Sequence, residues 1–420
     1  MKLGTNPYKG VRDFYPEDMS VQNEIFSIWK NIVRKYSYEE YGASILEPAE
    51  IYKAKTGEEI VNEQTYTFID RGDREVTLRP EMTPTLARMV AKKRRELIFP
   101  LRWFSIPNLF RYEQPQRGRL REHWQLNVDI FGVESIRAEA EIINIAYDIT
   151  KSYGLSDTDF EIRLNNRKVM NYVTKDVFNL SDEDTKKISK LIDKKNKISE
   201  NIFKKDIEEI LRDRTTEFIT LLNSKNFEDF STYLRQTKEE HEGIREIKEL
   251  ISILENIGIT NVRFDQTLMR GFDYYTGIVF EIFDLNPKNK RAVFGGGRYD
   301  DLLSIFDEDK VPAVGFGAGD VIARDLMETY RKKIQKDTIA DIAICVIGEK
   351  SAIYAMDIAN NLRSKGKKVM VDLSNKKIGD QISNAHKRGI PKVICIGDRE
   401  METGKYKIKD LTTGNEEDNI

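Results

Sequence analysis

The chain has 420 residues, and 40% of them are hydrophobic, which is enough apolar material for the cores of roughly three globular domains. Its 68 Lys and Arg residues nearly balance its 70 Asp and Glu residues, so the net charge gives no sign of a nucleic-acid partner and any basic surface must be local. The three histidines lie far apart in sequence, which argues against a histidine-rich metal site or a histidine-based catalytic triad.

Neither a signal peptide nor a membrane span is expected. The first ten residues, MKLGTNPYKG, lack the apolar core of a signal peptide, and no apolar run approaches the roughly 20 residues that span a bilayer. The two cysteines, Cys345 and Cys395, lie in apolar, strand-like runs, which predicts reduced core thiols without a disulfide. These features predict a cytoplasmic protein with no membrane partner.

The N-terminal part is predicted to contain two helices on either side of short strands. The first helix is expected to begin near Pro16, because proline and the acidic residues after it suit a first turn. Its apolar stripe recurs at helical spacing: Val21, Ile25, Ile28, Ile32 and Tyr36. Three strands are expected next: 43–47, 65–70 and 75–79. Thr83 and Pro84 then predict the cap and first residue of a second helix.

Residues 110–132, FRYEQPQRGRLREHWQLNVDIFG, predict a hairpin whose tip is formed by residues 115–118. Because residues two apart on a strand share a face, two sets of polar side chains are expected to point together: Arg111 with Glu113, and Gln125 with Asn127 and Asp129. Guanidinium donors beside carboxylate and amide acceptors suit an anionic ligand such as a nucleotide phosphate. The alternative is an exposed ribbon with ordinary surface ion pairs.

A change of composition near residue 166 predicts an inserted domain. From there to about 258 the chain is rich in charged and aliphatic residues, contains no proline, and has one glycine, Gly243, before Gly258. This composition is typical of helices, and strand patterns resume at Val262. We therefore expect a helical domain, 166–258, inserted into a first domain that consists of residues 1–165 and 259–330.

After Asp341 short strands alternate with helices, which predicts an α/β domain over residues 336–420 with a small, parallel-type sheet. The expected strands are 342–347, 368–372 and 393–396. Residues 365–392 carry eight Lys or Arg side chains against two Asp side chains in a chain that is otherwise neutral. This run is either a solvated basic face or a local nucleic-acid contact.

Three glycine-bearing stretches separate the helical region from the C-terminal domain: RGFDYYTG (270–277), VFGGGRYDD (293–301) and VGFGAGD (314–320). Taken singly, each is a weak signal, because none has the ending of a phosphate loop or the spacing of a dinucleotide fingerprint. Tight turns or close packing of a strand against a helix are the ordinary explanation for such glycines.

The order of the stretches is more specific than any one of them. The series LRPEMTP (78–84), FRYEQPQRGRLREHWQLNVDIFG (110–132), RGFDYYTG (270–277), FGGGRYDDL (294–302) and GFGAGD (315–320) resembles the histidyl-tRNA synthetases over nearly the whole chain. RGFDYYTG and GGGRYD carry the specificity, because other class II synthetases share the arginine of motif 2 but not these stretches. The resemblance implies an α/β (α+β) fold: an antiparallel-sheet class II catalytic domain, an inserted helical domain and a C-terminal α/β anticodon-binding domain.

The same resemblance implies an ATP-dependent histidine–tRNA ligase. Such an enzyme joins L-histidine to ATP, releasing pyrophosphate, and transfers the histidyl group from the adenylate to the 3′ end of tRNA(His). The implied catalytic residues are Arg111, which would bridge the α-phosphate and the histidine carboxylate, and Arg270, which would lie across the α-phosphate. No metal is expected on protein ligands alone, and Mg²⁺ is expected to be bound through the ATP phosphates. The family also implies a homodimer.

The implied binding residues fall into two sets. Those expected to bind histidine are Glu81, Thr83, Gln125, Asp129, Tyr274, Tyr275 and Tyr299. Those expected to bind ATP are Arg111, Glu113, Arg119, His123, Arg270, Gly317 and Gly319. In the first set, Asp129 and Tyr275 would contact the two imidazole nitrogens, and reading both nitrogens allows discrimination on the order of 10⁴.

Two positions depart from the pattern of the family. His123 stands where many relatives have a phenylalanine under the adenine ring. Common motif 3 sequences end in Gly-x-Glu-Arg, whereas here Ile322 occupies the arginine position and Arg324 follows two residues later, about 200° round a helix. The γ-phosphate would then be held by Arg119, Arg298 or Mg²⁺.

Two other functions remain open from the sequence. A non-catalytic, histidine-sensing regulatory paralogue is the first, and the missing arginine of motif 3 keeps it open. A nucleic-acid-binding accessory subunit of another enzyme is the second. Both would lack adenylate formation, so exchange of labelled pyrophosphate into ATP distinguishes them from a ligase.

Overall fold

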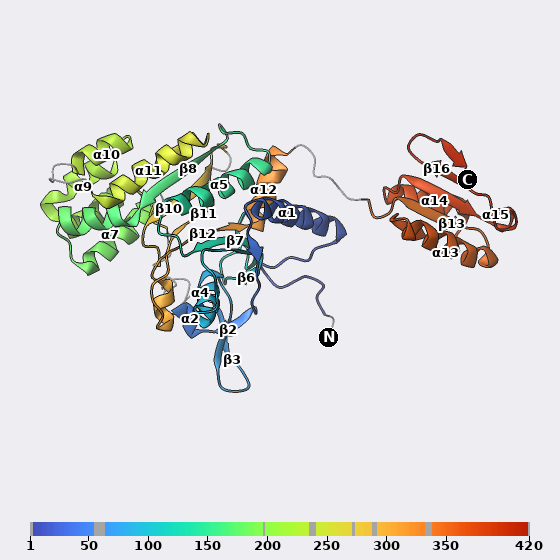
Figure 1. Cartoon of the computed structure of the whole chain (residues 1–420), viewed down its shortest axis with the longest axis horizontal. Coiled ribbons are helices and arrows are strands. Elements are labelled where there is room, and N and C mark those ends of the chain that lie inside the picture. The colour runs from blue at the N-terminus through green and yellow to red at the C-terminus, as the bar shows by residue number, and fades with distance from the viewer. Residues whose placement is uncertain are drawn as a thin grey trace. The chain divides into compact units, whose positions relative to one another are not determined.

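The computed structural model describes residues 3–53, 64–195, 198–234, 241–270, 274–287, 292–331 and 338–418. It separates into two units, Met1–Ile334 and Gln335–Ile420 (Figure 1). The expected fold class is confirmed, since a largely antiparallel sheet forms the first unit and a smaller mixed sheet forms the second. Among the described helices, none is both long and apolar enough to cross a lipid bilayer.

The main sheet of the first unit joins strands from distant parts of the chain. Its strands are β1 (Glu39–Glu40), β5 (Leu101–Ser105), β6 (Asn108–Phe110), β7 (Glu122–Phe131), β8 (Phe160–Asn166), β9 (Val262–Phe264), β10 (Ile278–Asp284), β11 (Ala292–Arg298) and β12 (Ala313–Gly319). Their order in the sheet is β1-β5-β7-β12-β11-β10-β8-β9, with β6 paired to β7 off this path. Neighbours from β5 to β8 run antiparallel, so β7 lies beside β12, which comes much later in the chain.

The predicted hairpin over residues 110–132 is confirmed. Strands β6 and β7 pair with Phe110 opposite Glu122, and the backbone N–H of Arg111 donates to the carbonyl of Arg121 (2.9 Å). A short bridge between Gln116 and Arg119 closes the tip. The strand β7 therefore carries Gln125, Asn127 and Asp129 on one face, as expected from the alternation.

Two of the three glycine-bearing stretches form strands and not turns, so the turn explanation was wrong for them. Gly295, Gly296 and Gly297 lie within β11, and Gly315, Gly317 and Gly319 lie within β12. A Cβ atom at Gly296 would lie 1.9 Å from the carbonyl oxygen of Gly315 on the neighbouring strand. Glycine is therefore needed at that position for β11 and β12 to pair.

Helices cover one face of the main sheet and form the largest core. They are α1 (Pro16–Lys35), α5 (Arg137–Ser152) and α12 (Asp320–Tyr330). The expected first helix is confirmed, but its most deeply buried stripe differs from the predicted one: Gln22, Ile25, Trp29 and Val33. Trp29 Nε1 donates to Tyr153 Oη (2.5 Å) in this core, while Val21, Ile28 and Ile32 are only half-buried.

A second, smaller sheet precedes the helix α4 (Thr83–Lys93). It contains β2 (Leu46–Pro48), β3 (Tyr66–Ile69) and β4 (Glu75–Leu78) in the order β2-β4-β3, so the predicted hairpin is confirmed. Pro48 is the last residue of the edge strand β2, a position that tolerates proline. The cap of α4 is Met82, and Thr83, the predicted cap, is its first helical residue. The short helix α2 (Glu50–Lys53) lies beside α4.

The region predicted to be helical lies between β8 and β9. Its helices are α6 (Arg167–Asn171), α7 (Asp182–Lys194), α8 (Glu200–Leu211), α9 (Thr215–Leu222), α10 (Phe227–Leu234) and α11 (Glu242–Asn256). Shorter helical turns link them: Tyr172–Val177 and Arg212–Arg214. Helix α11 packs on α5, β8 and β10, which joins the helices to the main sheet (Figure 1).

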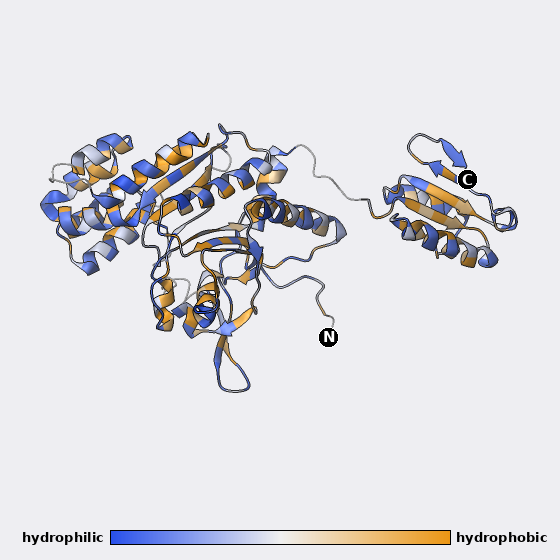
Figure 2. Cartoon of the chain, in the orientation of Figure 1, coloured by the Kyte–Doolittle hydropathy of each residue, from blue (hydrophilic) through white to orange (hydrophobic). Residues whose placement is uncertain are grey.

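The second unit is the predicted α/β arrangement with an added hairpin. Its strands are β13 (Ile342–Val346), β14 (Val369–Val371), β15 (Lys392–Ile396), β16 (Lys407–Asp410) and β17 (Glu416–Asp418), and its helices are α13 (Glu349–Ser364), α14 (Ile378–Lys387) and α15 (Asp398–Thr403). β13 pairs in parallel with β14 and β15, as expected, whereas β16 and β17 add antiparallel strands. Figure 2 shows why the sequence did not reveal this hairpin: β13 and β15 are hydrophobic, but β17 is hydrophilic.

The two cysteines are register partners on β13 and β15, and both are free thiols. Cys345 is buried and Cys395 is half-buried. This agrees with the prediction of reduced cysteines in the core of the C-terminal domain.

Candidate active site

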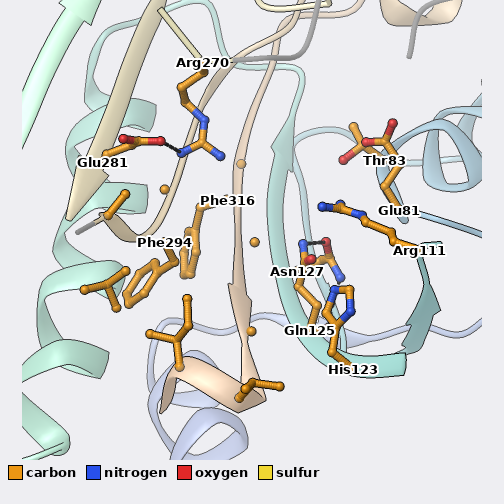
Figure 3. Close-up of a pocket in the computed structure, with 18 of the residues that line it drawn as sticks. Glu81, Thr83, Arg111, His123, Gln125, Asn127, Arg270, Glu281, Phe294 and Phe316 are labelled. Atoms are coloured by element: carbon orange, nitrogen blue, oxygen red, sulfur yellow. Dashed lines mark hydrogen bonds and ion pairs between the residues drawn. The ribbon is translucent and has the colours of Figure 1, made fainter. Parts of the chain in front are cut away.

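A cavity of about 290 Å³ lies over the glycine-rich centre of the main sheet. The structure brings every residue of the two predicted binding sets to its wall: Glu81, Thr83, Arg111, Glu113, Arg119, His123, Gln125, Asp129, Arg270, Tyr274, Tyr275, Tyr299, Gly317 and Gly319. Figure 3 shows Arg111 and Arg270 on opposite sides of this cavity, with both side chains directed towards it. Two arginines that are distant in sequence therefore face the same space.

The wall expected to bind histidine consists of buried polar side chains that hold one another. Tyr299 Oη donates to Asp129 Oδ1 (2.5 Å), and Tyr274 Oη donates to Glu81 Oε2 (3.1 Å). Only 4% of Asp129 and 2% of Glu81 are exposed. Because a buried polar group is costly to leave unpaired, these pairs fix the positions of two carboxyl groups before any ligand binds.

Burial changes the protonation of Asp129. Removal from water raises its pKa to about 7, and the hydrogen bond from Tyr299 opposes this rise only in part. The carboxyl group therefore exchanges its proton close to neutral pH, in the same range as a free imidazole.

Glycines on β12 make room for the polar side chains of β7. A Cβ atom at Gly315 would lie 2.1 Å from Asp129 Oδ1, and one at Gly317 would lie 1.8 Å from Gln125 Nε2. No heavy atom lies within 4 Å of a Cβ built at Gly319. Gly315 is therefore required, because its Cβ would also lie 2.6 Å from the backbone carbonyl oxygen of Val128, whereas a side chain at Gly317 would displace the flexible end of Gln125. Gly319 leaves the surface of the cavity open at its position.

Arg270 is fixed from two sides in an unusual backbone conformation. Its φ angle is +48°, and its Nη1 donates to Glu281 Oε1 (2.9 Å) on β10. A Cβ atom at Gly295 would lie 2.4 Å from the same Nη1, so the absence of a side chain at this position of β11 leaves the space that the guanidinium group occupies. A left-handed conformation in a residue other than glycine is unusual, and such conformations cluster at functional sites.

Arg111 is held on the opposite wall. Its Nε donates to the carbonyl oxygen of Pro80 (2.8 Å), which leaves the terminal nitrogens directed towards the cavity (Figure 3). Nearby, Arg119 Nη1 lies 3.6 Å from Glu113 Oε2, and 63% of the Arg119 side chain is exposed. Arg119, near the tip of the hairpin, is thus held far more loosely than Arg111.

His123 is a half-buried, neutral ring on this wall. Its pKa is lowered to about 3, first by burial and then by the positive charges of Arg111 and Arg12. The imidazole therefore carries no charge at neutral pH, and it can stack on a flat, uncharged ligand ring.

One candidate for the γ-phosphate is excluded. Arg298 is 6% exposed and binds Glu139 through Nε (2.5 Å) and Nη2 (2.6 Å). Its Nη1 donates to Asp300 Oδ1 (3.2 Å), so carboxylates neutralise its charge. Arg298 also does not line the cavity.

Arg324 likewise binds Asp18 and Glu328 away from the cavity wall. Arg119 is the remaining protein candidate.

Several further residues line the cavity to which the sequence assigned no binding role. They are Glu281, Phe294, Phe316, Val321, Ile322, Gly295 and Gly315, and also Asn127, which was expected only to share a face with Gln125 and Asp129. Glu281 could have been suspected, because it is a carboxylate inside the apolar run 278–283 of β10. Phe294 and Phe316 stack with ring centroids 5.7 Å apart, but nothing in their spacing indicated a ligand site. In the described part of the chain, no group of three or more metal-binding side chains is present.

Two family models together match most of the chain. A family model described as histidyl-tRNA synthetase matches residues 10–319, and one described as anticodon binding domain matches residues 341–419. The histidine–tRNA ligase of Leptospira biflexa is 42% identical over 430 residues, which cover 99% of this chain and 95% of that protein.

Two solved structures resemble the fold. The histidyl-tRNA synthetase from Nostoc sp. PCC 7120 superposes with a TM-score of 0.81 at 22% identity, covering 100% of this chain and 97% of that one. A structure described as an ATP phosphoribosyltransferase regulatory subunit/histidyl-tRNA synthetase, from Bacillus halodurans, gives a TM-score of 0.76 at 24% identity, with 91% and 97% covered. At these identities the likeness concerns the fold alone.

Proposed function

The chain belongs to the histidyl-tRNA synthetase family, and on this premise we propose that it is a histidine–tRNA ligase whose cavity over the main sheet activates L-histidine with ATP. The observation that supports this most is the pairing of Arg111 and Arg270 across one cavity whose other walls carry buried carboxyl groups. Two guanidinium groups suit a reaction in which two anions must meet.

In the first step a carboxylate oxygen of histidine forms a bond to the α-phosphorus of ATP, and the bond to the bridging oxygen breaks. Pyrophosphate leaves with that electron pair, so the step needs charge compensation and alignment and no acid or base. Arg111 bridges the histidine carboxylate and the α-phosphate, and Arg270 stabilises the charge that develops on the α-phosphate. Loss of either arginine should cost about 3 to 4 kcal/mol of transition-state stabilisation.

In the second step a ribose hydroxyl at the 3′ end of the tRNA attacks the carbonyl carbon of the adenylate. The ester bond forms, the bond from the carbonyl carbon to the bridging oxygen breaks, and AMP leaves with that oxygen while the proton of the ribose hydroxyl passes to the departing phosphate. The loop around Gln116 to Arg119, at the tip of the hairpin, is the part of the cavity rim that we expect to approach the end of the tRNA.

The buried wall selects histidine. Glu81, Thr83 and Gln125 accept hydrogen bonds from the α-ammonium group, which needs such acceptors. Asp129 and Tyr275 contact the two ring nitrogens, and Tyr299 orients Asp129 by its hydrogen bond (2.5 Å). A side chain without two nitrogens would leave these buried groups unpaired, which is a strong basis for rejection.

The opposite wall binds ATP. The neutral ring of His123 stacks on adenine, Glu113 accepts from the adenine amino group, and the nucleotide lies over Gly317 and Gly319. Mg²⁺ enters with the ATP phosphates, and Arg119 binds the outer phosphates in place of the arginine that motif 3 lacks.

The second unit binds the anticodon region of tRNA(His), and its basic run over residues 365–392 supports this role. Replacing the exposed Lys376 and Lys377 with alanine should lower the rate of tRNA charging while leaving pyrophosphate exchange unchanged. Equal loss of both activities would contradict this role. We also expect a cytoplasmic homodimer with α1 and β2 at its interface.

A regulatory, non-catalytic paralogue is the second candidate. The fold alone does not distinguish it, because one structure of similar fold is described in both terms. A match to an anticodon binding domain and the presence of Arg270 in the cavity favour the ligase.

The test is exchange of labelled pyrophosphate into ATP with twenty amino acids offered separately. Only histidine should support exchange, and Arg270→Ala should lower its rate by about 10² to 10³-fold. Arg324→Ala is the matched control, because this arginine does not line the cavity. Exchange driven by another amino acid, or none with histidine, would refute the assignment.

A further inference from the structure

Arg270 is the last residue of a short segment, 265–270, that follows the strand β9. The segment lies between two different supports, the main sheet and the helical region. The contacts that hold this segment in place therefore also set the position of Arg270 in the cavity.

On the side of the main sheet, the segment is hydrogen-bonded to β8. The backbone N–H of Asp265 donates to the carbonyl of Leu164 (2.8 Å). The side chain of Asn165, which is 1% exposed, donates through Nδ2 to the carbonyl oxygens of Gln266 (3.3 Å) and Leu268 (2.9 Å). These bonds fix the segment's backbone relative to the strand.

On the other side, one side chain reaches the helical region. Gln266 is 7% exposed, and its Nε2 donates to the carbonyl oxygens of Leu222 (2.6 Å) and Ser224 (3.0 Å). Leu222 is the last residue of α9, so these carbonyls belong to a helix end that has no further helical donors. Gln266 therefore completes the end of a helix in the predicted inserted domain from within the segment that carries Arg270.

Packing reinforces the same contact. The ring of Phe264, the last residue of β9, lies 4.9 Å from the rings of both Phe227 and Phe230 on α10. Helices α9 and α10 thus both contact the stretch 264–266, which leads to Arg270.

We infer that the helical region positions Arg270, and that Gln266 is the positioning residue through which it does so. This inference rests on the proposed function of Arg270 as an α-phosphate ligand. Gln266 does not line the cavity, so it acts only through the segment 265–270. A simple helix cap would stabilise the fold without influencing the reaction.

The test is Gln266→Met, which keeps the length of the side chain and removes its amide donor. Because a shift of about 1 Å at a reacting group can cost on the order of 10²-fold, we expect single-turnover adenylate formation to slow by about 10 to 100-fold. The Michaelis constant for histidine should stay within about twofold, since the residues proposed to bind histidine do not belong to the segment 265–270.

Two controls separate positioning from general weakening. Gln381→Met is matched, because this buried glutamine of the second unit also donates to two carbonyl oxygens, of Val346 (2.8 Å) and Lys376 (2.7 Å). It should not change adenylate formation. Combining Gln266→Met with Arg270→Ala should add little to the loss from Arg270→Ala alone, because the two changes act on one group.

The outcomes are distinguishable. Normal adenylate formation by Gln266→Met, or a full additional loss in the Arg270→Ala background, would overturn the inference. Absence of histidine-dependent exchange in the unaltered protein would instead overturn the proposed function. If Gln266→Met does not fold, Phe227→Leu weakens the packing of α10 on Phe264, next to the segment that carries Arg270. It should slow adenylate formation a few-fold with an unchanged Michaelis constant for histidine; an unchanged rate would count against the inference.

Discussion

The two walls of the cavity are built in opposite ways. On the wall proposed to bind histidine, Asp129 and Glu81 are buried and each accepts a hydrogen bond from a buried tyrosine. On the wall proposed to bind ATP, the side chain of Arg119 is 63% exposed and only loosely paired. The first wall is formed before the ligand arrives, whereas the second depends on an exposed hairpin tip.

The difference follows from what each ligand requires. Selecting one amino acid among twenty requires polar groups that lose binding free energy when a wrong amino acid leaves them unpaired. This loss is large only where the groups are buried and fixed in position. ATP carries several charges that an exposed arginine can meet in more than one geometry. We therefore expect changes on the buried wall to have larger and more specific effects than changes at the tip.

The largest effect is expected from Gly315→Ala on the buried wall. The new methyl group would lie 2.1 Å from Asp129 Oδ1 and 2.6 Å from the carbonyl oxygen of Val128, so the carboxyl and the neighbouring backbone of β7 must both move. The Michaelis constant for histidine in pyrophosphate exchange should rise by about 100-fold or more. Gly319→Ala is the comparison on the same strand: nothing lies within 4 Å of its added carbon, so the Michaelis constant for histidine should stay unchanged, and only that for ATP should rise because the nucleotide is proposed to lie over this glycine. Equal effects of the two substitutions would break the proposed division between the walls.

Asp129→Asn should have opposite effects on function and stability. The pKa of Asp129 is raised to about 7 by burial, so between about pH 4 and pH 7 the folded protein holds a proton that the unfolded chain releases. The free energy of unfolding should therefore fall as pH rises through this range and level off above pH 7. The asparagine variant should lack this slope.

Above pH 7 the Asp129→Asn variant should be more stable than the unaltered protein by about 2 to 4 kcal/mol, while histidine binding is weakened. Urea unfolding at pH 5.5 and pH 8, followed by tryptophan fluorescence, measures this. Trp29, Trp103 and Trp124 all lie in the first unit, so the signal reports the unit that contains the cavity. A variant less stable than the unaltered protein at pH 8 would show that Asp129 is not strained by burial.

The sequence predicted the members of the cavity wall far better than the reasons for their positions. Alternation along β7 predicted that Gln125 and Asp129 share a face, because strand geometry is local. The need for Gly315 was not predictable, because it arises between β12 and β7, which are distant in sequence.

Ion pairs between residues that are distant in sequence were equally impossible to predict. The bond from Arg270 to Glu281 and the burial of Arg298 against Glu139 join separate elements, and no spacing rule reveals them. Arg298 was for this reason a wrong candidate for the γ-phosphate. The C-terminal hairpin β16–β17 was missed because its strands are short and polar and lack the apolar alternation that marks a half-buried strand.

On the looser wall, Arg119→Ala should raise the Michaelis constant for ATP by about 10-fold and leave that for histidine unchanged. The effect is modest because the side chain is exposed, and water and salt screen its charge. The difference between variant and unaltered protein should shrink as the salt concentration rises. Insensitivity to salt would indicate that the tip closes over the nucleotide and excludes water, which would make the two walls more alike than proposed.

The smallest effect is expected from His123→Phe. The pKa of His123 is lowered to about 3, so the ring is already neutral and apolar in character across the physiological range. Replacing one flat, neutral ring with another should change the Michaelis constant for ATP by only about two- to threefold, and this constant should show no ionisation near pH 6.5 in either protein. His123→Ala, which removes the stacking surface, should have the larger effect. A titration near pH 6.5 that disappears in the phenylalanine variant would mean that Arg111 and Arg12 do not suppress the charge of this ring, and that its contribution to nucleotide binding is electrostatic.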